Sequence, residues 1–373
     1  MAHSSEEVAR WLVATCDPRW RGEGSLPPGP VPPGLAAAAG TQGVAALVAA
    51  RLAGRRELPG ELRDLPGRSR ARAEAQEVIL LSAAERLERA GIPFLVLKGL
   101  PLDRRLGWKR GDRWHKDIDL LVARRDVPPA REVLSGLGYR PVPVTGGAGF
   151  HEVLVRPGWQ ATGTLELHWD VTPDGHPVRF PVDSWLAAPG RVTLSGTALP
   201  VPPAPGEVGY LAWHAFARGV ALLRDLAVVA AAWCRLPGEA RHRALEEADR
   251  AGAARFLGEA LRLAGGTWPG IPGPGPSPRP GGVRGRCLAA FSRAGRGLAG
   301  GSLPPWQEQL LVHWALLPGS GFPAGLPGLV ARAVPGTGGG GAGRALGRWG
   351  ARVKGGVSVL LVLLRALVSR SAA

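Results

Sequence analysis

The sequence predicts an α+β fold, in which a small sheet with helices is followed by a mainly helical C-terminal half. Between residues 71 and 204, short apolar runs rich in β-branched residues alternate with segments of helical period, which indicates strands set between helices. From about residue 205 the apolar positions recur at helical spacing. With 373 residues, of which 45% are apolar, the chain is long enough to bury a large core.

Residues 1–70 are expected to form an N-terminal helical segment. Ser4 and Glu7 have the spacing of a capping box, and apolar residues at helical spacing follow them. The proline-rich stretch "GSLPPGPVPPG" then indicates a turn, and an alanine-rich sequence predicts one helix over about residues 36–52.

Residues 71–204 contain the predicted sheet. The strands are short apolar runs bounded by glycine, proline or polar residues, and the helices begin or end at proline and glycine. The expected elements are a helix over 71–90 that ends at Gly91, a strand in "PFLVLKG", a helical turn in "LPLDRRLG", a strand in "HKDIDLLV", a helix in "VPPAREVLSGLGY" that ends before Gly138, and strands in "HEVLVR" and "GTLELHW".

The C-terminal half divides by composition into three parts. Pro205 and Glu207 are typical of a helix start, and residues 205–264 are predicted to be a helical domain. Residues 265–282, "GGTWPGIPGPGPSPRPGG", have the composition of a linker. Residues 283–373 are expected to be helical and glycine-rich, with a helix at the end.

The chain is strongly basic, with 46 Lys and Arg against 30 Asp and Glu and a formal charge of +16. Such a balance favours anionic partners, namely nucleotides, nucleic acid or acidic lipid. The sequence has no Arg-Gly-Gly tract and no continuous basic stripe, so it does not favour a dedicated nucleic-acid-binding protein.

The cysteines and the ends of the chain bear on its location. Three widely spaced cysteines without a CxxC pair argue against a zinc finger or a disulfide framework and predict a reducing cytoplasm. The N-terminus carries acids before any apolar run, which is not typical of a signal peptide. The run from Val357 to Val368 is too short to span a bilayer and is interrupted by Arg365. We expect it to pack on the protein's own core, and peripheral contact with a membrane is the open alternative.

Carboxylates alternate with apolar residues in two of the predicted strands. Asp117 and Asp119 point to one face of "HKDIDLLV", and Glu166 and His168 point to one face of "LELHW". If these strands are neighbours, three carboxylates meet, and such oxygen ligands are those that Mg²⁺ prefers beside nucleotide phosphates. A pair of aspartates alone is more often a solvated strand end.

Several short motifs in a fixed order resemble one family. They are "LVLKGLPL", "RWHKDIDLLV", "LGY", "LELHWDV" and "LAWHAFARGVALLRDLA". Together, over about residues 75–235, they resemble the uncharacterised nucleotidyltransferase family of the polymerase-beta-like nucleotidyltransferase superfamily. The resemblance implies a small mixed sheet with helices, and it makes residues 71–204 the nucleotidyltransferase-like catalytic domain. It also implies transfer of a nucleoside monophosphate from a nucleoside triphosphate, with release of pyrophosphate.

The resemblance assigns the metal ligands. It implies that Asp117 and Asp119 hold two divalent ions, Mg²⁺ or alternatively Mn²⁺, and that Glu166 is a third ligand that also lowers the pKa of the attacking hydroxyl. Two such ions would bind the attacking and leaving oxygens of the phosphoryl group.

The same resemblance suggests residues for the triphosphate and the acceptor. Lys98 and Gly99 stand where the superfamily usually has Gly-Ser, and they would contact phosphate. Arg113 would contact phosphate too, or it is a solvated loop arginine. His168 would orient Glu166 or contact the acceptor, or it is structural.

Three positions of the helical half can be compared with the pattern of the same family. His214 and Asp225 match the family pattern, whereas Arg218 stands where a second histidine is expected. We expect this part to shape the acceptor pocket rather than to do chemistry.

The sequence leaves three functions open. The leading one is a Mg²⁺-dependent, ATP- or other NTP-binding nucleotidyltransferase that modifies a hydroxyl of a small molecule, a peptide or a protein. A second is a toxin-like nucleotidyltransferase that modifies transfer RNA, which the charge of +16 favours. The third is a binding module on the same fold without activity.

Overall fold

The computed structural model describes residues 5–274, apart from residues 21, 23–25, 56, 143–148, 159–162 and 218–221. The expectations for Ser4, Arg218 and everything beyond residue 274 lie outside this part. The described elements are α1 (Ser5–Thr15), α2 (Leu35–Thr41), α3 (Ala45–Arg51), α4 (Gly60–Arg63), α5 (Leu65–Arg89), β1 (Phe94–Leu97), α6 (Gly99–Arg105), β2 (Asp117–Val122), the short 3₁₀ helix η2 (Arg124–Asp126), α7 (Val127–Ser135), β3 (Arg140–Val142), β4 (His151–Val155), β5 (Thr164–His168), α8 (Val182–Ala187), β6 (Gly190–Leu194), β7 (Thr197–Val201), α9 (Ala204–Phe216), α10 (Leu223–Arg235), α11 (Gly238–Arg250) and α12 (Ala254–Thr267).

The N-terminal segment differs from the prediction in one place. The single helix expected over 36–52 is wrong, because the chain forms α2 and α3 with a break between them. Gly43 in this break has a φ of 68°, which is left-handed and incompatible with a continuing helix. The glycine therefore ends one helix and lets the next begin at Ala45.

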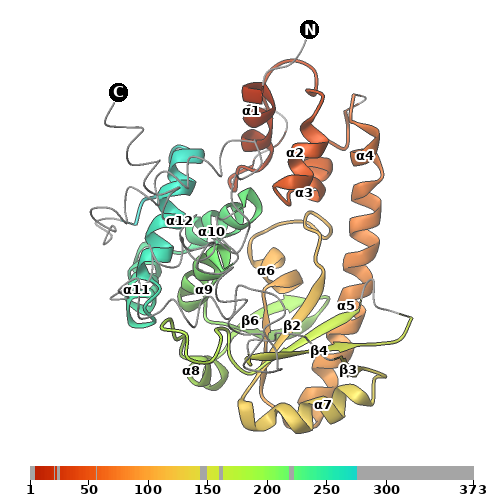
Figure 1. Cartoon of the computed structure of the whole chain (residues 1–373), viewed down its shortest axis with the longest axis vertical. Coiled ribbons are helices and arrows are strands. Elements are labelled where there is room, and N and C mark those ends of the chain that lie inside the picture. Colours follow the sequence, from red (N-terminus) through yellow and green to blue (C-terminus); the bar gives the residue numbers. More distant parts are fainter. Residues whose placement is uncertain are drawn as a thin grey trace, which may run out of the picture. The chain divides into compact units, whose positions relative to one another are not determined.

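The helix α5 is the longest described helix and begins earlier than predicted, at Leu65. Its end is as expected: Gly91 has a φ of 67°, and the amide of Ile92 donates to the carbonyl of Leu87, as in a Schellman motif. Figure 1 shows α5 running beside the sheet.

The small mixed sheet is confirmed and has five strands in the order β1-β2-β5-β4-β3. The strands β2 and β5 are parallel, and the other neighbouring pairs are antiparallel. A second sheet is the hairpin β6-β7. The prediction missed β3, a three-residue edge strand that contains Pro141, and it also missed the hairpin, whose turn is Ser195-Gly196.

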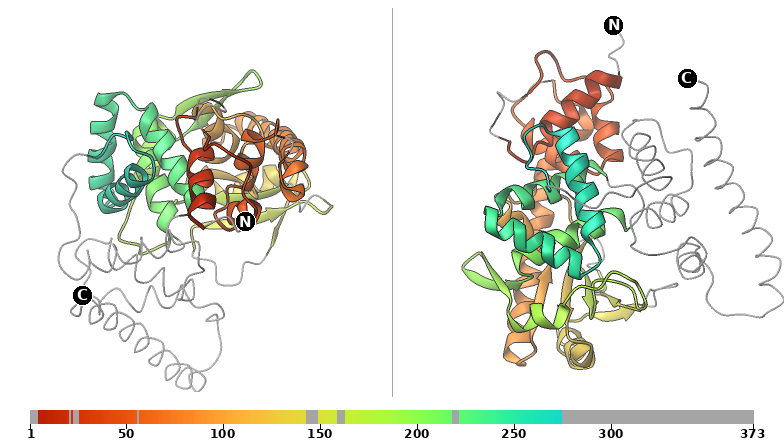
Figure 2. Two further views of the ribbon diagram at one scale, coloured as in Figure 1. Left: turned by 90° about the horizontal axis from the view of Figure 1, so that it is seen from above. Right: turned by 90° about the vertical axis from the view of Figure 1, so that its left-hand side faces the viewer.

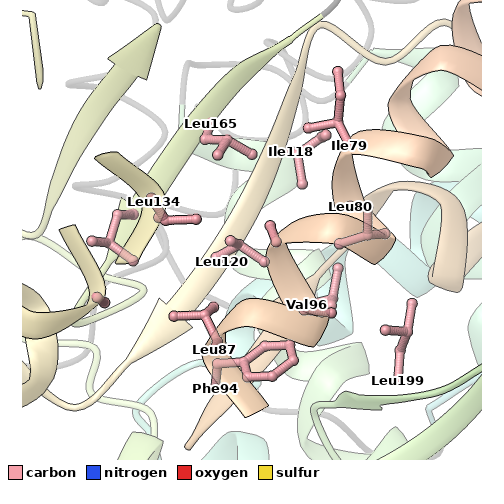
Figure 3. Packing of buried hydrophobic residues seen from close by; sticks show 14 of the residues in the cluster. Ile79, Leu80, Leu87, Phe94, Val96, Ile118, Leu120, Leu134, Leu165 and Leu199 are labelled. Carbon is pink, nitrogen blue, oxygen red and sulfur yellow. The ribbon is translucent and has the colours of Figure 1, made fainter. Parts of the chain in front are cut away.

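One face of the sheet is apolar and packs on helices. Side chains of β2 and β5 lie against α5 and α7 in a single buried cluster (Figure 3). The residues of this cluster that Figure 3 labels are Ile79, Leu80, Leu87, Phe94, Val96, Ile118, Leu120, Leu134, Leu165 and Leu199. Because strand side chains alternate, burial of this face leaves the carboxylates of β2 and β5 together on the other one.

The described residues of 205–264 are mostly helical, as predicted. The helix α12 packs against both α10 and α11 (Figure 2). It continues to Thr267, so residues 265–267, which were expected to belong to a linker, are helical. Among the described residues, no helix has both the length and the apolar character needed to cross a membrane.

Candidate active site

The register of two parallel strands brings the predicted carboxylates together. Asp119 of β2 lies opposite Glu166 of β5, and Asp117 lies opposite Thr164. Since side chains two residues apart share a face, Asp117, Asp119 and Glu166 lie on one side of the sheet. The expectation that β2 and β5 are neighbours is therefore confirmed.

Asp119 is the buried member, with a side chain that is 5% exposed. Its Oδ1 atom lies 3.2 Å from Nε2 of His168 and 3.5 Å from Nζ of Lys98. Burial alone would raise the pKa of Asp119, but the charge of Lys98 and the hydrogen bond from His168 outweigh it and lower this pKa. Asp119 is thus a carboxylate held in its ionised form.

Asp117 is in the opposite situation. It lies at the start of β2 and is partly exposed. Burial raises the pKa of Asp117, and the negative charges of Asp119 and Glu166 raise it further. In this state of the protein, Asp117 carries a charge that its neighbours repel.

His168 joins the carboxylates of the two strands. Its Nε2 atom lies 3.3 Å from Oε2 of Glu166 as well as 3.2 Å from Asp119. Burial lowers the pKa of His168, but the hydrogen bonds with both carboxylates outweigh this and raise it. The ring stacks on that of His151, with centroids 4.9 Å apart. Sequence reasoning missed His151, although it is the first residue of the predicted strand "HEVLVR".

Asp119, Glu166 and His168 form a group that could hold a metal ion. Each offers one ligand atom, and these atoms lie within 4.8 Å of one another. Asp117 is not in this group, but it is close enough for Asp119 and Glu166 to raise its pKa. Three carboxylates suit Mg²⁺, which prefers oxygen ligands, whereas a set that includes imidazole suits softer metals.

The chain matches the family of uncharacterised nucleotidyltransferases over residues 32–269. This covers more than half of its length. The chain belongs to this family. Its members are nucleotidyltransferases by description, which agrees with the carboxylates of β2 and β5.

Solved structures that are similar to the chain include two antibiotic adenylyltransferases. One is ANT(2")-Ia in complex with adenylyl-2"-tobramycin, with 14% identity, a TM-score of 0.35, and coverage of 47% of this chain and 98% of that one. Another is the lincosamide antibiotic adenylyltransferase LnuA with lincomycin bound, with 16% identity, a TM-score of 0.28, and coverage of 35% and 82%. No curated protein matches the chain.

Lys98 and Gly99 of this nucleotidyltransferase lie where β1 ends and α6 begins. Gly99 lines one hollow together with Asp117 and Asp119. A Cβ atom at Gly99 would meet nothing within 4 Å, and its φ of 61° is one that glycine adopts readily. Lys98 is in contact with Asp119, so the structure brings both predicted phosphate-binding residues to the carboxylates.

Arg113 forms an ion pair within the protein. Its Nη1 atom lies 2.7 Å from Oδ1 of Asp103, and its guanidinium stacks over the ring of Trp108. Nε2 of His115 lies 2.6 Å from the other oxygen of Asp103. Burial would raise the pKa of Asp103, but Arg113 and His115 lower it. Phosphate contact by Arg113 stays a prediction, and it would require this ion pair to open.

The helix α9 adds two residues to the site. His214 and Tyr210 are one turn apart, and their rings are 5.9 Å from centroid to centroid. Nε2 of His214 lies 3.2 Å from Nζ of Lys98, and the ammonium lies 5.8 Å from the ring centre of Tyr210. Burial raises the pKa of Tyr210 to about 12. Sequence reasoning missed Tyr210, although its spacing of four residues from His214 is a usable signal.

Asp225, the other residue of the helical half that matches the family pattern, pairs with a neighbour. Its Oδ1 atom lies 3.0 Å from Nε of Arg224 in the first turn of α10. An acceptor pocket in this region stays a prediction.

Proposed function

We propose that the chain transfers a nucleoside monophosphate from a nucleoside triphosphate to a hydroxyl group of a small molecule, a peptide or a protein. The observation that supports this most is the register of β2 and β5. It sets Asp119 beside Glu166, with Asp117 on the same face. Such a group has little structural use, because three carboxylates in one place repel each other.

We propose that the site binds two divalent ions. Asp117, Asp119 and Glu166 would hold them, and Mg²⁺ suits this set of oxygen ligands better than a softer metal. When bound, the ions neutralise the charge on the phosphates and stabilise the attacking and leaving oxygens. Mn²⁺ would fit the same ligands.

The transfer is an in-line displacement. The acceptor oxygen forms a bond with the α-phosphorus, and the bond from this phosphorus to the β-phosphate oxygen breaks, so that pyrophosphate leaves. Glu166, whose side chain is 24% exposed, is reachable from solvent and takes the proton of the hydroxyl. His168 holds Glu166 and Asp119 in place by its bonds with both.

Lys98 and Gly99 would receive the triphosphate. Gly99 lets the backbone come close to a phosphate, because it has no side chain at the edge of the hollow. Lys98 supplies a positive charge within reach of the carboxylates.

We infer that this reaction takes place in the cytoplasm. Cys16 and Cys234, the described cysteines, are free thiols. Free thiols are usual in a reducing compartment, where disulfides are rare.

The test is incubation with each radiolabelled triphosphate and Mg²⁺ in the presence of a cell extract. The expected result is release of pyrophosphate together with label on a small molecule, a peptide or a protein, and neither with Asp119→Asn. Label on RNA would instead favour the alternative acceptor that the charge of +16 suggests. Absence of pyrophosphate with all four triphosphates would favour a binding module.

A further inference from the structure

Lys98 is a cation that lies within the carboxylate site. Its Nζ atom is 3.5 Å from Oδ1 of Asp119 and 3.2 Å from Nε2 of His214, and its side chain is 17% exposed. The ammonium is thus held between β2 and α9. It neutralises part of the charge of three carboxylates that would otherwise repel each other unscreened.

The ammonium pairs with a carboxylate that the proposed metal site uses. Oδ1 of Asp119 already accepts from His168 at 3.2 Å, and Lys98 approaches the same oxygen. A divalent ion on this oxygen would lie within a few ångströms of the ammonium and be repelled by it. Lys98 and the ion therefore compete for Asp119 and cannot both occupy it fully.

The kind of residue supports an exchangeable contact. Of the 46 basic residues, only four are lysines, namely Lys98, Lys109, Lys116 and Lys354. The nearby fixed pairs use arginine, as in Arg113 with Asp103 and Arg105 with Glu207. A guanidinium forms rigid, two-pronged pairs, whereas an ammonium is a point charge on a flexible stem that can turn from one anion to another.

The backbone at Lys98 is also unusual. With a φ of 53° and a ψ of −145°, it shares a positive φ with only one other described residue that is not glycine, Ser195. Such a conformation persists only where surrounding contacts hold it, and it occurs often at ligand sites. Here the contacts at the far end of the side chain come from Asp119 and His214.

We propose that Lys98 is the resident counter-ion of the carboxylate site: Tyr210 and His214 hold it on Asp119 while no divalent ion is bound, and it leaves Asp119 when the nucleotide enters with its metal. Its ammonium then turns to the phosphates. Lys98 thus neutralises Asp119 before the nucleotide binds and the phosphates afterwards. Tyr210 and His214 are positioning residues in this scheme. The inference rests on the proposed function, because it assumes that Asp119 receives a metal ion.

The first test measures Mn²⁺ binding by calorimetry without nucleotide. Lys98→Met keeps the length of the side chain and removes the charge, so Asp119 should bind Mn²⁺ about tenfold more tightly than in the wild type. Lys116→Met is the matched control, because it removes an exposed lysine directly before Asp117, where solvent screens the charge. Equal or weaker affinity in Lys98→Met than in the control would overturn the proposal.

The second test follows Tyr210 directly. The chain has two tyrosines, so protein labelled with 3-fluorotyrosine gives two ¹⁹F signals, and Tyr139→Phe assigns them. Tyr139 lies in the apolar core and serves as an internal control. Loading with Mg²⁺ and a non-hydrolysable triphosphate should shift the signal of Tyr210 and not that of Tyr139, and Lys98→Met should shift it without ligand.

These outcomes separate the two proposals. If the wild type transfers nucleotide but the Tyr210 signal stays unchanged on loading, the counter-ion role is wrong and the proposed function stands. If neither the wild type nor Lys98→Met binds Mn²⁺, with or without triphosphate, the proposed function fails as well.

Discussion

Two buried aspartates of this protein each have a lowered pKa, but their surroundings are opposite. Asp103 pairs with Arg113 through one oxygen and with His115 through the other, at 2.7 and 2.6 Å. Asp119 accepts a hydrogen bond from His168 and forms an ion pair with Lys98 through one oxygen, and two further carboxylates lie beside it. The charge of Asp103 is balanced by its two partners, whereas Asp119 belongs to a group of three carboxylates with an excess of negative charge.

We propose that this difference separates a structural carboxylate from a metal-binding one. A buried charge with its own partners stabilises the loop between α6 and β2, and removing it leaves those partners unpaired. A cluster of like charges costs stability, so it is retained where an outside cation completes it. The charge balance around an aspartate, rather than its burial or the direction of its pKa shift, therefore indicates its role.

The largest expected effect is on activity at Asp119. Asp119→Asn should reduce transfer to background, because it removes the buried oxygen ligand and the partner of both Lys98 and His168. The fold should remain but lose some stability, because Lys98 and His168, which lower the pKa of Asp119, lose their charged partner. Pyrophosphate release and the melting temperature, measured on the same sample, check both statements. Activity equal to that of the wild type would contradict the assignment of the site.

Glu166→Gln should have the next largest effect. Loss of the proposed base should lower the turnover rate by about 10² to 10⁴, because one well-placed base contributes that much. Binding of the nucleotide should change little. Single-turnover rates and nucleotide titrations separate the two, and the carboxylate variant Glu166→Asp should retain part of the rate.

Asp103→Asn tests the other side of the comparison. It should lower the free energy of unfolding at pH 7 by about 3 to 5 kcal/mol, because the partly buried Arg113 and the buried His115 lose their charged partner. The pKa of Asp103 is lowered on folding, so its stabilisation is present above the unfolded value of about 4 and is lost as the pH falls through the folded one.

Urea denaturation at several pH values measures the difference in free energy of unfolding between the wild type and Asp103→Asn. This difference should become smaller in acid. The matched control is Asp174→Asn, which breaks an exposed ion pair with Arg124 and should cost less than about 1 kcal/mol. A loss at Asp103 no larger than that of the control would contradict its structural role.

The two clusters also differ in how far sequence alone predicts them. Asp117, Asp119 and Glu166 were predictable, because the alternation of a strand is local and each strand carries its own pattern. The partners of Arg113 and Lys98 were not, since Asp103 lies on another element and His214 is 116 residues away from Lys98. Such pairs depend on how the elements pack.

In the fold, too, some elements could be predicted from the sequence and others could not. Long periodic segments such as α5 were predictable in type although not in their first residue. The edge strand β3 was missed because it has three residues and a proline, and the alanine-rich helix was predicted whole because alanine propensity outweighed Gly43 in the sequence pattern.

Metal and nucleotide should each raise the affinity for the other. The metal-free cluster repels a triphosphate, so Mg²⁺ should strengthen nucleotide binding by roughly 1 to 3 kcal/mol, and linkage requires the same factor for the metal. Calorimetry in Mg²⁺ and in chelator measures this coupling. Asp119→Asn should shrink it, whereas Lys98→Ala should weaken nucleotide binding under both conditions. Equal affinity in chelator and in Mg²⁺ would show that the carboxylates are not a metal site.

The smallest expected effect has the opposite sign to that at Asp103. In chelator, Asp117→Asn should raise the free energy of unfolding at neutral pH by up to about 1 kcal/mol, because burial and the charges of Asp119 and Glu166 raise the pKa of Asp117. A raised pKa means that stability present below the unfolded value of about 4 is lost as the pH rises through the folded value, so the gain from the substitution should vanish in acid. Saturating Mg²⁺ should reverse the order, since the bound ion stabilises the wild type more than a variant that lacks one ligand. In chelator, an Asp→Asn change should therefore stabilise the protein at Asp117 and destabilise it at Asp103. Denaturation in chelator and in Mg²⁺ shows whether it does, and a destabilised Asp117→Asn in chelator would place Asp117 with the paired carboxylates instead.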